Sequence, residues 1–417
     1  MNKSTTSTSS SSSTTTTTPK KSKHRHHLHH QPQQQQEKDH HQSLLPGLPD
    51  HIAQICLSHV QPSLLYSVSK SWRRLIYSPS FPPFLSIYAI LLPKQTKSNI
   101  LPNSIRFCCF DPISALWNAV PQPPPPDPPL SLLLHHPSFI SRRLPVQSVT
   151  VSGRLVFLAA TANHFVPALS RPLIFNPLSQ NWTYGPPLAA PRRWCAAGAS
   201  RGVVYVASGI GSHYNPEVAR SVEKWDLEIN HRRSVIKRRG PQQTTWKWEK
   251  IEGMRDGKFS REAIDAIGWR GKLCMVNVKG DAAKEGIIYN VENDGWEDMP
   301  GGMLMGWKGP AASMNEEIIY MVDESKGVLK KYDREMDTWV EILEDDSLKG
   351  ADYIAAAGGK VCVVGGAGDS ILVVDVRVTP SRFWVVDTPV GSQAIAVHIL
   401  PRMNQTKNGL SSLEGLC

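Results

Sequence analysis

The residues best suited to recognition chemistry are cations and aromatic rings that recur in the stretches between apolar segments. Arginine pairs with carboxylates and phosphates in a bidentate geometry, and a neighbouring aromatic ring adds an apolar contact surface. The pattern predicts a face that binds an acidic or phosphorylated protein segment; the alternative is that these are ordinary solvated loop charges. The candidate binding residues are Arg142, Arg143, Arg192, Arg193, Trp194, Tyr214, Arg255, Arg261 and Trp307, with Lys258, Lys308, His164 and His213 in equivalent stretches.

Neither the cysteines nor the histidines form a pattern typical of a metal site. The seven cysteines are odd in number and contain no CxxC pair, which argues against a disulfide framework or a zinc knuckle. The histidines from His24 to His41 belong to a low-complexity tail, where metal binding would be weak and adventitious. We therefore expect no cofactor and no metal, and a reducing compartment, the cytoplasm and/or the nucleus.

Length and composition indicate a globular protein with an unusual start. The chain has 417 residues, and its 40% hydrophobic content suffices for a large core. Its first 43 residues consist of Ser/Thr repeats followed by KKSKHRHHLHH and QPQQQQ, which predicts disorder. No apolar run approaches the roughly 18 residues of a membrane span, so we expect a soluble protein without a membrane partner.

One pattern recurs along the chain from residue 85 onward. An apolar run ends near Asp or Asn, and Trp follows six residues later, as in Asp111 to Trp117, Asn176 to Trp182, Asn290 to Trp296 and Asp333 to Trp339. Two further copies are stretched, one around Trp225 and one ending at Trp384. Upstream of most copies lies a hairpin with a glycine turn and a β-branched second arm, such as SGRLVFLA and AGGKVCVVGG. Each unit therefore holds four short strands.

Six such units, roughly 45 to 65 residues apart, predict a propeller of four-stranded blades. The first unit lacks its own first strand, and residues 393–400, QAIAVHIL, are the candidate to supply it from the other end of the chain. This pairing would close the ring and remove two free sheet edges. We interpret the repeated Trp residues as packing between blades rather than as ligand contacts.

These units resemble the kelch-repeat propeller family. The resemblance rests on the GK-type arms, the Gly365-Gly366 pair, the Tyr332-Asp333 pair and the step to Trp339. The match is degenerate, because only the last unit has a clear double glycine. It implies an all-β propeller, with six blades as the expected number.

A different, helical pattern occupies the residues before the propeller. Ile55 and Cys56 lie three and four residues after Ile52, Val60 lies four residues after Cys56, and a second helical segment begins after residue 63. Some forty residues of helix bury too little apolar surface by themselves, so this block must dock on a partner or fold back on the propeller.

The helical block resembles the F-box, through Leu48-Pro49, the helix IAQICLSHV and the stretch VSKSWRRLI. Together with the propeller, it looks like the plant F-box/kelch-repeat proteins of the Skp-interacting-partner group. The resemblance implies a substrate receptor of an SCF ubiquitin ligase, which binds a Skp-type adaptor joined to cullin and RING subunits, and holds a target protein for ubiquitination. The implied adaptor-binding residues are Leu48, Pro49, Ile52, Cys56, Leu57, Leu65, Val68 and Trp72.

Two other classes of function compete with this one. A propeller enzyme would need a Tyr, Cys and His copper site or a set of Asp boxes with an Arg cluster, and NVENDGWEDMP is one isolated, broken Asp box. We therefore expect no catalytic activity. An interaction or nucleic-acid-binding protein outside a ligase is the alternative, prompted by the net charge of +10 and by HRRSVIKRRG at 231–240, which also fits a nuclear import signal or a solvated loop.

The expected organisation has four parts. A disordered tail covers 1–43, an F-box covers 44–83, a kelch-type propeller covers 85–402, and a flexible tail covers 403–417.

Overall fold

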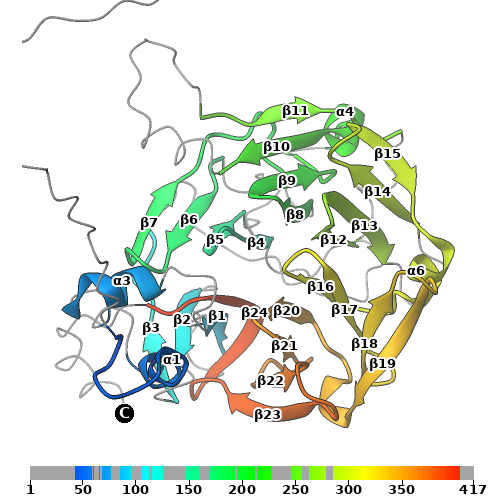
Figure 1. The fold of residues 1–417 in the computed structure, drawn as a ribbon. Helices are drawn as coiled ribbons and strands as arrows, with labels where there is room; N and C mark the ends of the chain where they lie inside the picture. The colour runs from blue at the N-terminus through cyan, green and yellow to red at the C-terminus, as the bar shows by residue number, and fades with distance from the viewer. Residues whose placement is uncertain are drawn as a thin grey trace, which may run out of the picture. The chain divides into compact units, whose positions relative to one another are not determined.

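The structure, a computed structural model, contains six four-stranded antiparallel sheets arranged in a ring (Figure 1). It describes residues 43–58, 60, 65, 68–76, 85–94, 105–111, 115–124, 147–158, 170–192, 195–211, 214–227, 246–255, 263–278 and 285–403. We number the sheets as blades 1 to 6 in chain order. The predicted six-bladed β-propeller is confirmed.

Blades 2 to 6 are each built from four consecutive strands. Their strands are β4 Ser148–Val151, β5 Arg154–Phe157, β6 Leu173–Asn176 and β7 Asn181–Tyr184 in blade 2; β8 Ala196–Ser200, β9 Val203–Ala207, β10 Val222–Asp226 and β11 Glu249–Ile251 in blade 3; β12 Ala263–Trp269, β13 Lys272–Val278, β14 Gly286–Asn290 and β15 Gly295–Asp298 in blade 4; β16 Ala311–Met314, β17 Ile318–Asp323, β18 Val328–Asp333 and β19 Thr338–Glu344 in blade 5; and β20 Tyr353–Ala357, β21 Lys360–Val364, β22 Ser370–Asp375 and β23 Arg382–Asp387 in blade 6.

Blade 1 combines both ends of the propeller. Its strands β1 Leu85–Pro93, β2 Arg106–Asp111 and β3 Leu116–Ala119 come from the start, and its innermost strand β24 Ser392–Pro401 comes from the end. The pairing of β24 with β1 extends from Leu85 opposite Pro401 to Pro93 opposite Ser392. The predicted ring closure by residues 393–400 is therefore confirmed.

Tight turns join the first two strands of blades 2 to 6, and two residues separate these strands except in blade 5, where Glu317 adds a third. The first two residues of each turn have positive φ, which gives the type I′ geometry whose twist matches that of the flanking strands. The turns are Ser152–Gly153, Arg201–Gly202, Arg270–Gly271, Asn315–Glu316 and Gly358–Gly359. In all of these turns except Asn315–Glu316, glycine at the second position lowers the cost of this backbone conformation, as the sequence pattern predicted.

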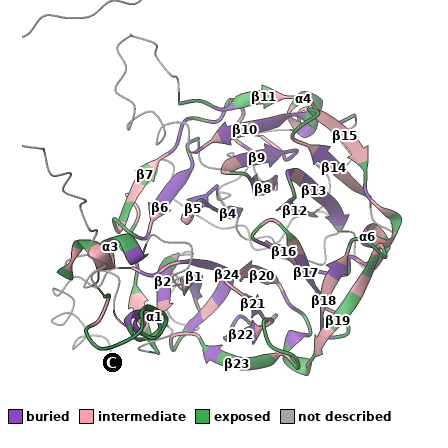
Figure 2. Cartoon of the chain, in the orientation of Figure 1, coloured by how far each residue is buried: buried purple, intermediate pink, exposed green. Residues whose placement is uncertain are grey.

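A separate hydrophobic cluster fills each of the six interfaces between neighbouring blades. The cluster between blades 6 and 1, for example, joins Val364 and Val373 to Ile87 and Val397. Figure 2 shows the result, with buried residues on the inner strands and exposed residues concentrated on the outermost ones. The core is thus a ring of six interfaces, which explains why every blade needs two neighbours.

One tryptophan in each of blades 1 to 5 anchors that blade to the one before it. Their indole Nε1 atoms donate hydrogen bonds to backbone carbonyls, at 2.6 to 3.2 Å, from Trp117 to Asp387, Trp182 to Pro121, Trp248 to Pro186, Trp296 to Glu252 and Trp339 to Met303. The interpretation of these residues as packing between blades is confirmed. It is wrong for Trp384 of blade 6, whose exposed fraction is 41%.

The helices in the described ranges are short. The helical block contributes α1 Asp50–Ser58 and α3 Lys70–Ile76, and the propeller carries α4 Pro216–Arg220, α6 Gly301–Gly306 and the 3-10 helix Asp346–Leu348. Within the described ranges, none of the helices combines the length and apolarity needed to cross a membrane.

Candidate functional sites of the helical block and the propeller

The helical block has a small hydrophobic core of its own. Leu57 of α1, Leu75 of α3 and Leu65, which lies between the two helices in the sequence, are buried against one another, and Trp72 packs beside them. The Trp72 indole donates a 2.7 Å hydrogen bond to the carbonyl of Leu44. Leu57, Leu65 and Trp72, which the F-box resemblance implied for adaptor binding, therefore hold the block together from inside.

The start of α1 is fixed by the residues that precede it. The Asp50 carboxylate accepts a 3.2 Å hydrogen bond from the backbone N–H of Leu44, and the Pro49 carbonyl accepts from the N–H groups of Ile52 and Ala53. An acidic side chain in this first turn also interacts favourably with the helix dipole. This arrangement sets the direction in which α1 presents its side chains.

Helix α1 carries a second apolar face that remains exposed. Ala53 and Leu57 point into the block, whereas Ile52, Ile55 and Cys56 lie on the other side of the helix. The exposed fractions are 38% for Ile52 and 55% for Ile55, and Leu48 just before the helix reaches 39%. We call Leu48, Ile52, Ile55 and Cys56 the α1 apolar stripe.

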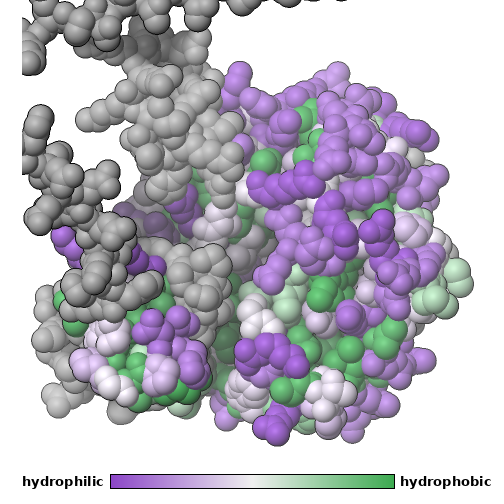
Figure 3. All heavy atoms as spheres, in the orientation of Figure 1, coloured by the Kyte–Doolittle hydropathy of each residue, from purple (hydrophilic) through white to green (hydrophobic). Residues whose placement is uncertain are grey.

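Two further residues named from the sequence lie at the surface of the block. Pro49 is exposed, and Val68 has an exposed fraction of 58%. The residues implied by the F-box resemblance do not include Ile55, although its three-residue step from Ile52 places both residues on one side of a helix. In Figure 3, apolar residues reach the surface of the helical block among polar ones.

The predicted basic face of the propeller is described only in part. Arg142, Arg143, Arg193, Trp194 and Arg261 lie outside the described residues, as do Lys258, His164, His213 and the basic stretch 231–240. Tyr214, with an exposed fraction of 46%, and the exposed Arg255 and Lys308 are at the surface. These three lie on loops between blades or between the second and third strands of a blade.

Arg192 does not belong to such a face, because it is buried with an exposed fraction of 1%. Its guanidinium forms an ion pair with the buried Glu223 and donates to Ser221 Oγ at 2.6 Å and to the Ala190 carbonyl at 2.9 Å. Glu223 also accepts a 3.1 Å hydrogen bond from the N–H of Ala189. Arg192 therefore fixes the chain entering blade 3, which corrects its assignment as a target-binding residue.

Trp307 is also internal, with an exposed fraction of 0%. It follows α6 and packs in the cluster between blades 4 and 5, where its ring centroid lies 6.0 Å from that of Trp339. Its assignment as a target-binding residue is corrected as well, because its side chain fills an interface between blades.

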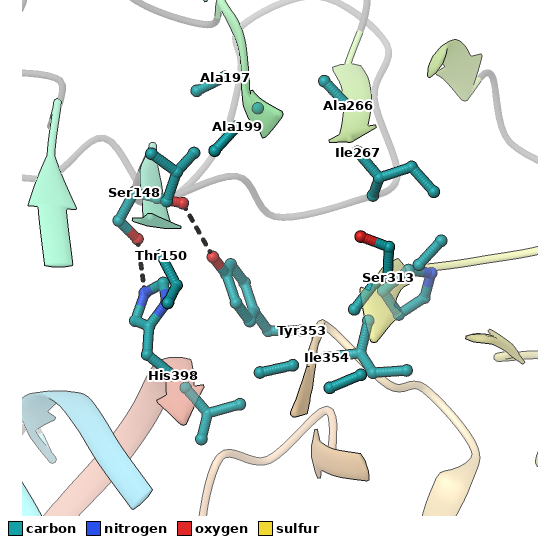
Figure 4. A pocket seen from close by; sticks show the side chains of 18 of the residues that line it. Ser148, Thr150, Ala197, Ala199, Ala266, Ile267, Ser313, Tyr353, Ile354 and His398 are labelled. Atoms are coloured by element: carbon teal, nitrogen blue, oxygen red, sulfur yellow. Dashed lines mark hydrogen bonds between the residues drawn. The ribbon is translucent and has the colours of Figure 1, made fainter. Parts of the chain in front are cut away.

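A cavity of about 210 Å³ lies at the centre of the propeller, between the innermost strands. Figure 4 shows Ser148, Thr150, Tyr353 and His398 on one side of it and small or aliphatic side chains on the other. The His398 ring forms hydrogen bonds with Ser148 Oγ at 2.9 Å and Thr150 Oγ1 at 3.0 Å, and the Tyr353 hydroxyl donates to the Ser148 carbonyl at 3.3 Å. This polar cluster links β4, β20 and β24, so it fastens the closing strand to two other blades.

Burial determines the protonation of the buried thiols and of His398. It raises the pKa of Cys109, Cys274 and Cys362 to about 12, so these thiols stay protonated at neutral pH. The same desolvation lowers the pKa of His398 to about 3, and the imidazole is therefore neutral at physiological pH.

The architecture thus defines a class of protein, a six-bladed propeller of four-stranded blades preceded by a small helical module with an exposed apolar stripe. Comparison with family models finds no match. The chain is 50% identical over 371 residues, 88% of its length, to the F-box/kelch-repeat protein SKIP25 of Arabidopsis thaliana, and the match covers 91% of that protein.

Two more distant relatives from the same plant agree with this match. The F-box protein AFR is 23% identical over 309 residues, 69% of this chain and 71% of the relative. A second F-box/kelch-repeat protein is 24% identical over 343 residues, 77% of this chain and 78% of the relative. The chain belongs to the F-box/kelch-repeat family.

The Arg192 ion pair yields a stability prediction. Replacement of Arg192 by Ala leaves the Glu223 carboxylate buried without its partner, so we expect a loss of about 3 to 5 kcal/mol in the free energy of unfolding. The matched change Arg255→Ala, at an exposed arginine, should cost less than about 0.5 kcal/mol. Urea unfolding measures both, and equal values for the two variants would contradict a structural role for Arg192.

His398 yields a prediction about pH. Its folded pKa, about 3, lies below the ordinary value of 6.5, so the unfolded chain binds the proton more tightly. Its contribution to stability is complete above about pH 6.5 and falls at lower pH, by up to about 1.4 kcal/mol per pH unit. The stability difference between wild type and His398→Gln should therefore shrink as pH falls from 7 to 4. A pH-independent difference in urea unfolding would rule this out.

Proposed function

We propose that this protein is a substrate receptor of an SCF-type ubiquitin ligase, with residues 44–83 as the adaptor-binding module and residues 85–402 as the target-binding module. A Skp-type adaptor would connect it to the cullin and RING subunits. The receptor itself makes no covalent bond. Its contribution is to raise the local concentration of target lysines near a ubiquitin-conjugating enzyme.

The single observation that carries this proposal is the α1 apolar stripe. One side of α1 packs on Leu65 and Leu75, and the other side still exposes Ile52 and Ile55. Contiguous apolar surface on so small a module is costly in water and typical of a protein interface. Pro49 and Val68 are exposed too and complete the adaptor-binding set that we propose, while Leu57 and Trp72 support it from beneath.

For the target side, we propose the propeller face that carries Tyr214, Arg255 and Lys308. All three are exposed, and a phenol and two cations on loops of one face suit a carboxylate or phosphate on a protein segment. Arg142, Arg143, Arg193, Trp194 and Arg261 remain part of this proposal on the basis of their sequence positions alone. The corresponding prediction for Arg192 and Trp307 is withdrawn.

We also place this function in the cytoplasm or the nucleus. The six cysteines in the described part of the chain are all free thiols. Free thiols persist in reducing compartments, and this supports the proposed location.

A double substitution tests the adaptor surface. Ile52→Lys with Ile55→Lys places two charges in the stripe without touching the core of the block, and should weaken binding of a Skp-type adaptor on the order of 100-fold. Leu178→Lys, at a residue with an exposed fraction of 49% in the β6–β7 turn, is the matched control and should bind normally.

Isothermal titration calorimetry with the purified adaptor provides the measurement, and unchanged thermal unfolding of the variants confirms the fold. If the double variant bound the adaptor as tightly as Leu178→Lys, the α1 stripe would not be the binding surface.

A further inference from the structure

The outermost strand of blade 6 differs from its five counterparts. Strand β23 exposes three consecutive large apolar residues, Phe383 at 42%, Trp384 at 41% and Val385 at 51%. The outermost strands of the other blades expose at most one each, Leu116 in β3 and Val340 in β19. In Figure 3, the rim over blades 3 and 4 is mainly hydrophilic, whereas apolar residues reach the surface lower in the same view, over blades 5 and 6.

A change in register produces this exposure. In blade 5, Trp339 lies opposite Tyr332 and bonds to the preceding blade. In blade 6 the corresponding position, opposite Val374, holds Phe383, and Trp384 lies one residue further along, opposite Val373. Because side chains alternate between the faces of a strand, Trp384 points to the other side, toward blade 1.

A groove therefore opens between the outer strands of blades 6 and 1. It has a volume of about 500 Å³ and is lined by Phe110 and Trp117 from blade 1 and by Trp384 and Val386 from blade 6. The Trp117 indole donates a 2.8 Å hydrogen bond to the carbonyl of Asp387, which fixes that wall of the groove. Both indole rings line the groove, whose volume admits a large apolar side chain.

The backbone beside this groove is open. Among the described strands β23 pairs only with β22, so its outer edge offers N–H and C=O groups without a strand partner, and of these the Asp387 carbonyl accepts from the Trp117 indole. Proteins normally protect such edges with charges, and β23 instead places Phe383, Trp384 and Val385 there. An extended segment of another chain can add to an edge of this kind as a further strand.

Two charges at the ends of β23 give the site a direction. Arg382 at its beginning and Asp387 at its end are both exposed, and neither forms an ion pair within the described part of the chain. They stand about 17 Å apart along the strand. An antiparallel partner strand would thus place a basic residue opposite Asp387, apolar residues in the middle and an acidic residue opposite Arg382.

We propose that β23 binds an extended segment of a partner protein as an antiparallel fifth strand of blade 6. The segment has a basic residue first, then apolar residues of which one enters the groove between Trp117 and Trp384, and an acidic residue last. This proposal does not rest on the ligase function, because it concerns a different surface from the α1 stripe and from the loop face.

The charges favour a partner protein over a second copy of this chain. A two-fold axis between two β23 strands would pair residues whose side chains lie on the same face of the sheet. Because side chains alternate between the faces, both paired residues would have even numbers or both would have odd numbers. Arg382 would then oppose Val386 or Thr388 of the other copy rather than Asp387. Self-pairing therefore leaves both charges out of register.

A labelled peptide tests the proposal with the full chain. The probe is fluorescein-labelled Lys-Phe-Val-Ile-Thr-Glu, and its charge-reversed twin is Glu-Phe-Val-Ile-Thr-Lys. The change Val385→Lys protects the edge, and the matched control Val340→Lys alters a residue with an exposed fraction of 46% in the outermost strand of blade 5. Equal thermal unfolding of the two variants confirms that both remain folded.

In fluorescence anisotropy, we expect saturable binding of the first peptide to the wild type and to Val340→Lys. Val385→Lys should bind at least about tenfold more weakly, and the charge-reversed twin about fivefold more weakly than the first peptide. Absence of saturable binding, or equal binding by the two variants, would overturn the proposal. So would a dimer in light scattering that Val385→Lys abolishes, because a second copy would then be the occupant.

Discussion

Closure of the propeller depends on one long-range pairing, that of β24 with β1. Ten residues from the end of the propeller fill the innermost place of the blade whose other strands come from its start. Two side-chain contacts secure the same junction, a 2.7 Å hydrogen bond from the Tyr88 hydroxyl to the Pro401 carbonyl and a buried ion pair between Arg402 and Asp111. These contacts join residues some three hundred positions apart. The chain between β1 and β24 therefore loses conformational entropy when it closes into a loop, before the contacts of blade 1 can compensate for the loss.

Among the other five interfaces a simpler device recurs. In four of them, from blades 1 and 2 to blades 4 and 5, an indole of one blade bonds to a backbone carbonyl of the blade before, and the pair shares a hydrophobic cluster. Between blades 5 and 6 this device is missing, since Phe383 stands where the tryptophan would be. The ring remains intact through the cluster of Val322, Leu329 and Val374 at that interface. The displaced Trp384 is consequently free to contribute to a surface rather than to the core.

Much of the fold was predictable because it follows from short-range spacing. The six-residue step from Asx to Trp and the glycine turns identified the blades, and an incomplete first unit pointed to residues 393–400 as its missing strand. The exposed sites were harder to predict. Arg192 and Arg255 look alike in the sequence, and only Ser221 and Glu223, 29 and 31 residues further along, make the first of them internal.

A similar limit applied to Trp384 and Ile55. The longer connection before β23 was visible in the sequence, but its effect on which face Trp384 occupies depends on the register with β22. Ile55 belonged to a recognised helical pattern, yet the side of α1 that packs inward depends on Leu65 and Leu75 in the next segment. Burial of this kind is a property of tertiary contacts, which local periodicity does not specify.

The measurement that tests this account most directly compares chains ending at residue 403 and at residue 391 by urea unfolding. Loss of β24 removes Val397, Ile399 and Leu400 among other buried residues, each worth about 1.5 to 3 kcal/mol, and the sum rivals the stability of a whole domain. We expect the longer chain to unfold like the full protein, and the shorter one to lack a cooperative transition until a peptide of residues 392–403 is added. A shorter chain that unfolds at the same urea concentration as the longer one would contradict closure by β24 as the constraint on which the structure depends.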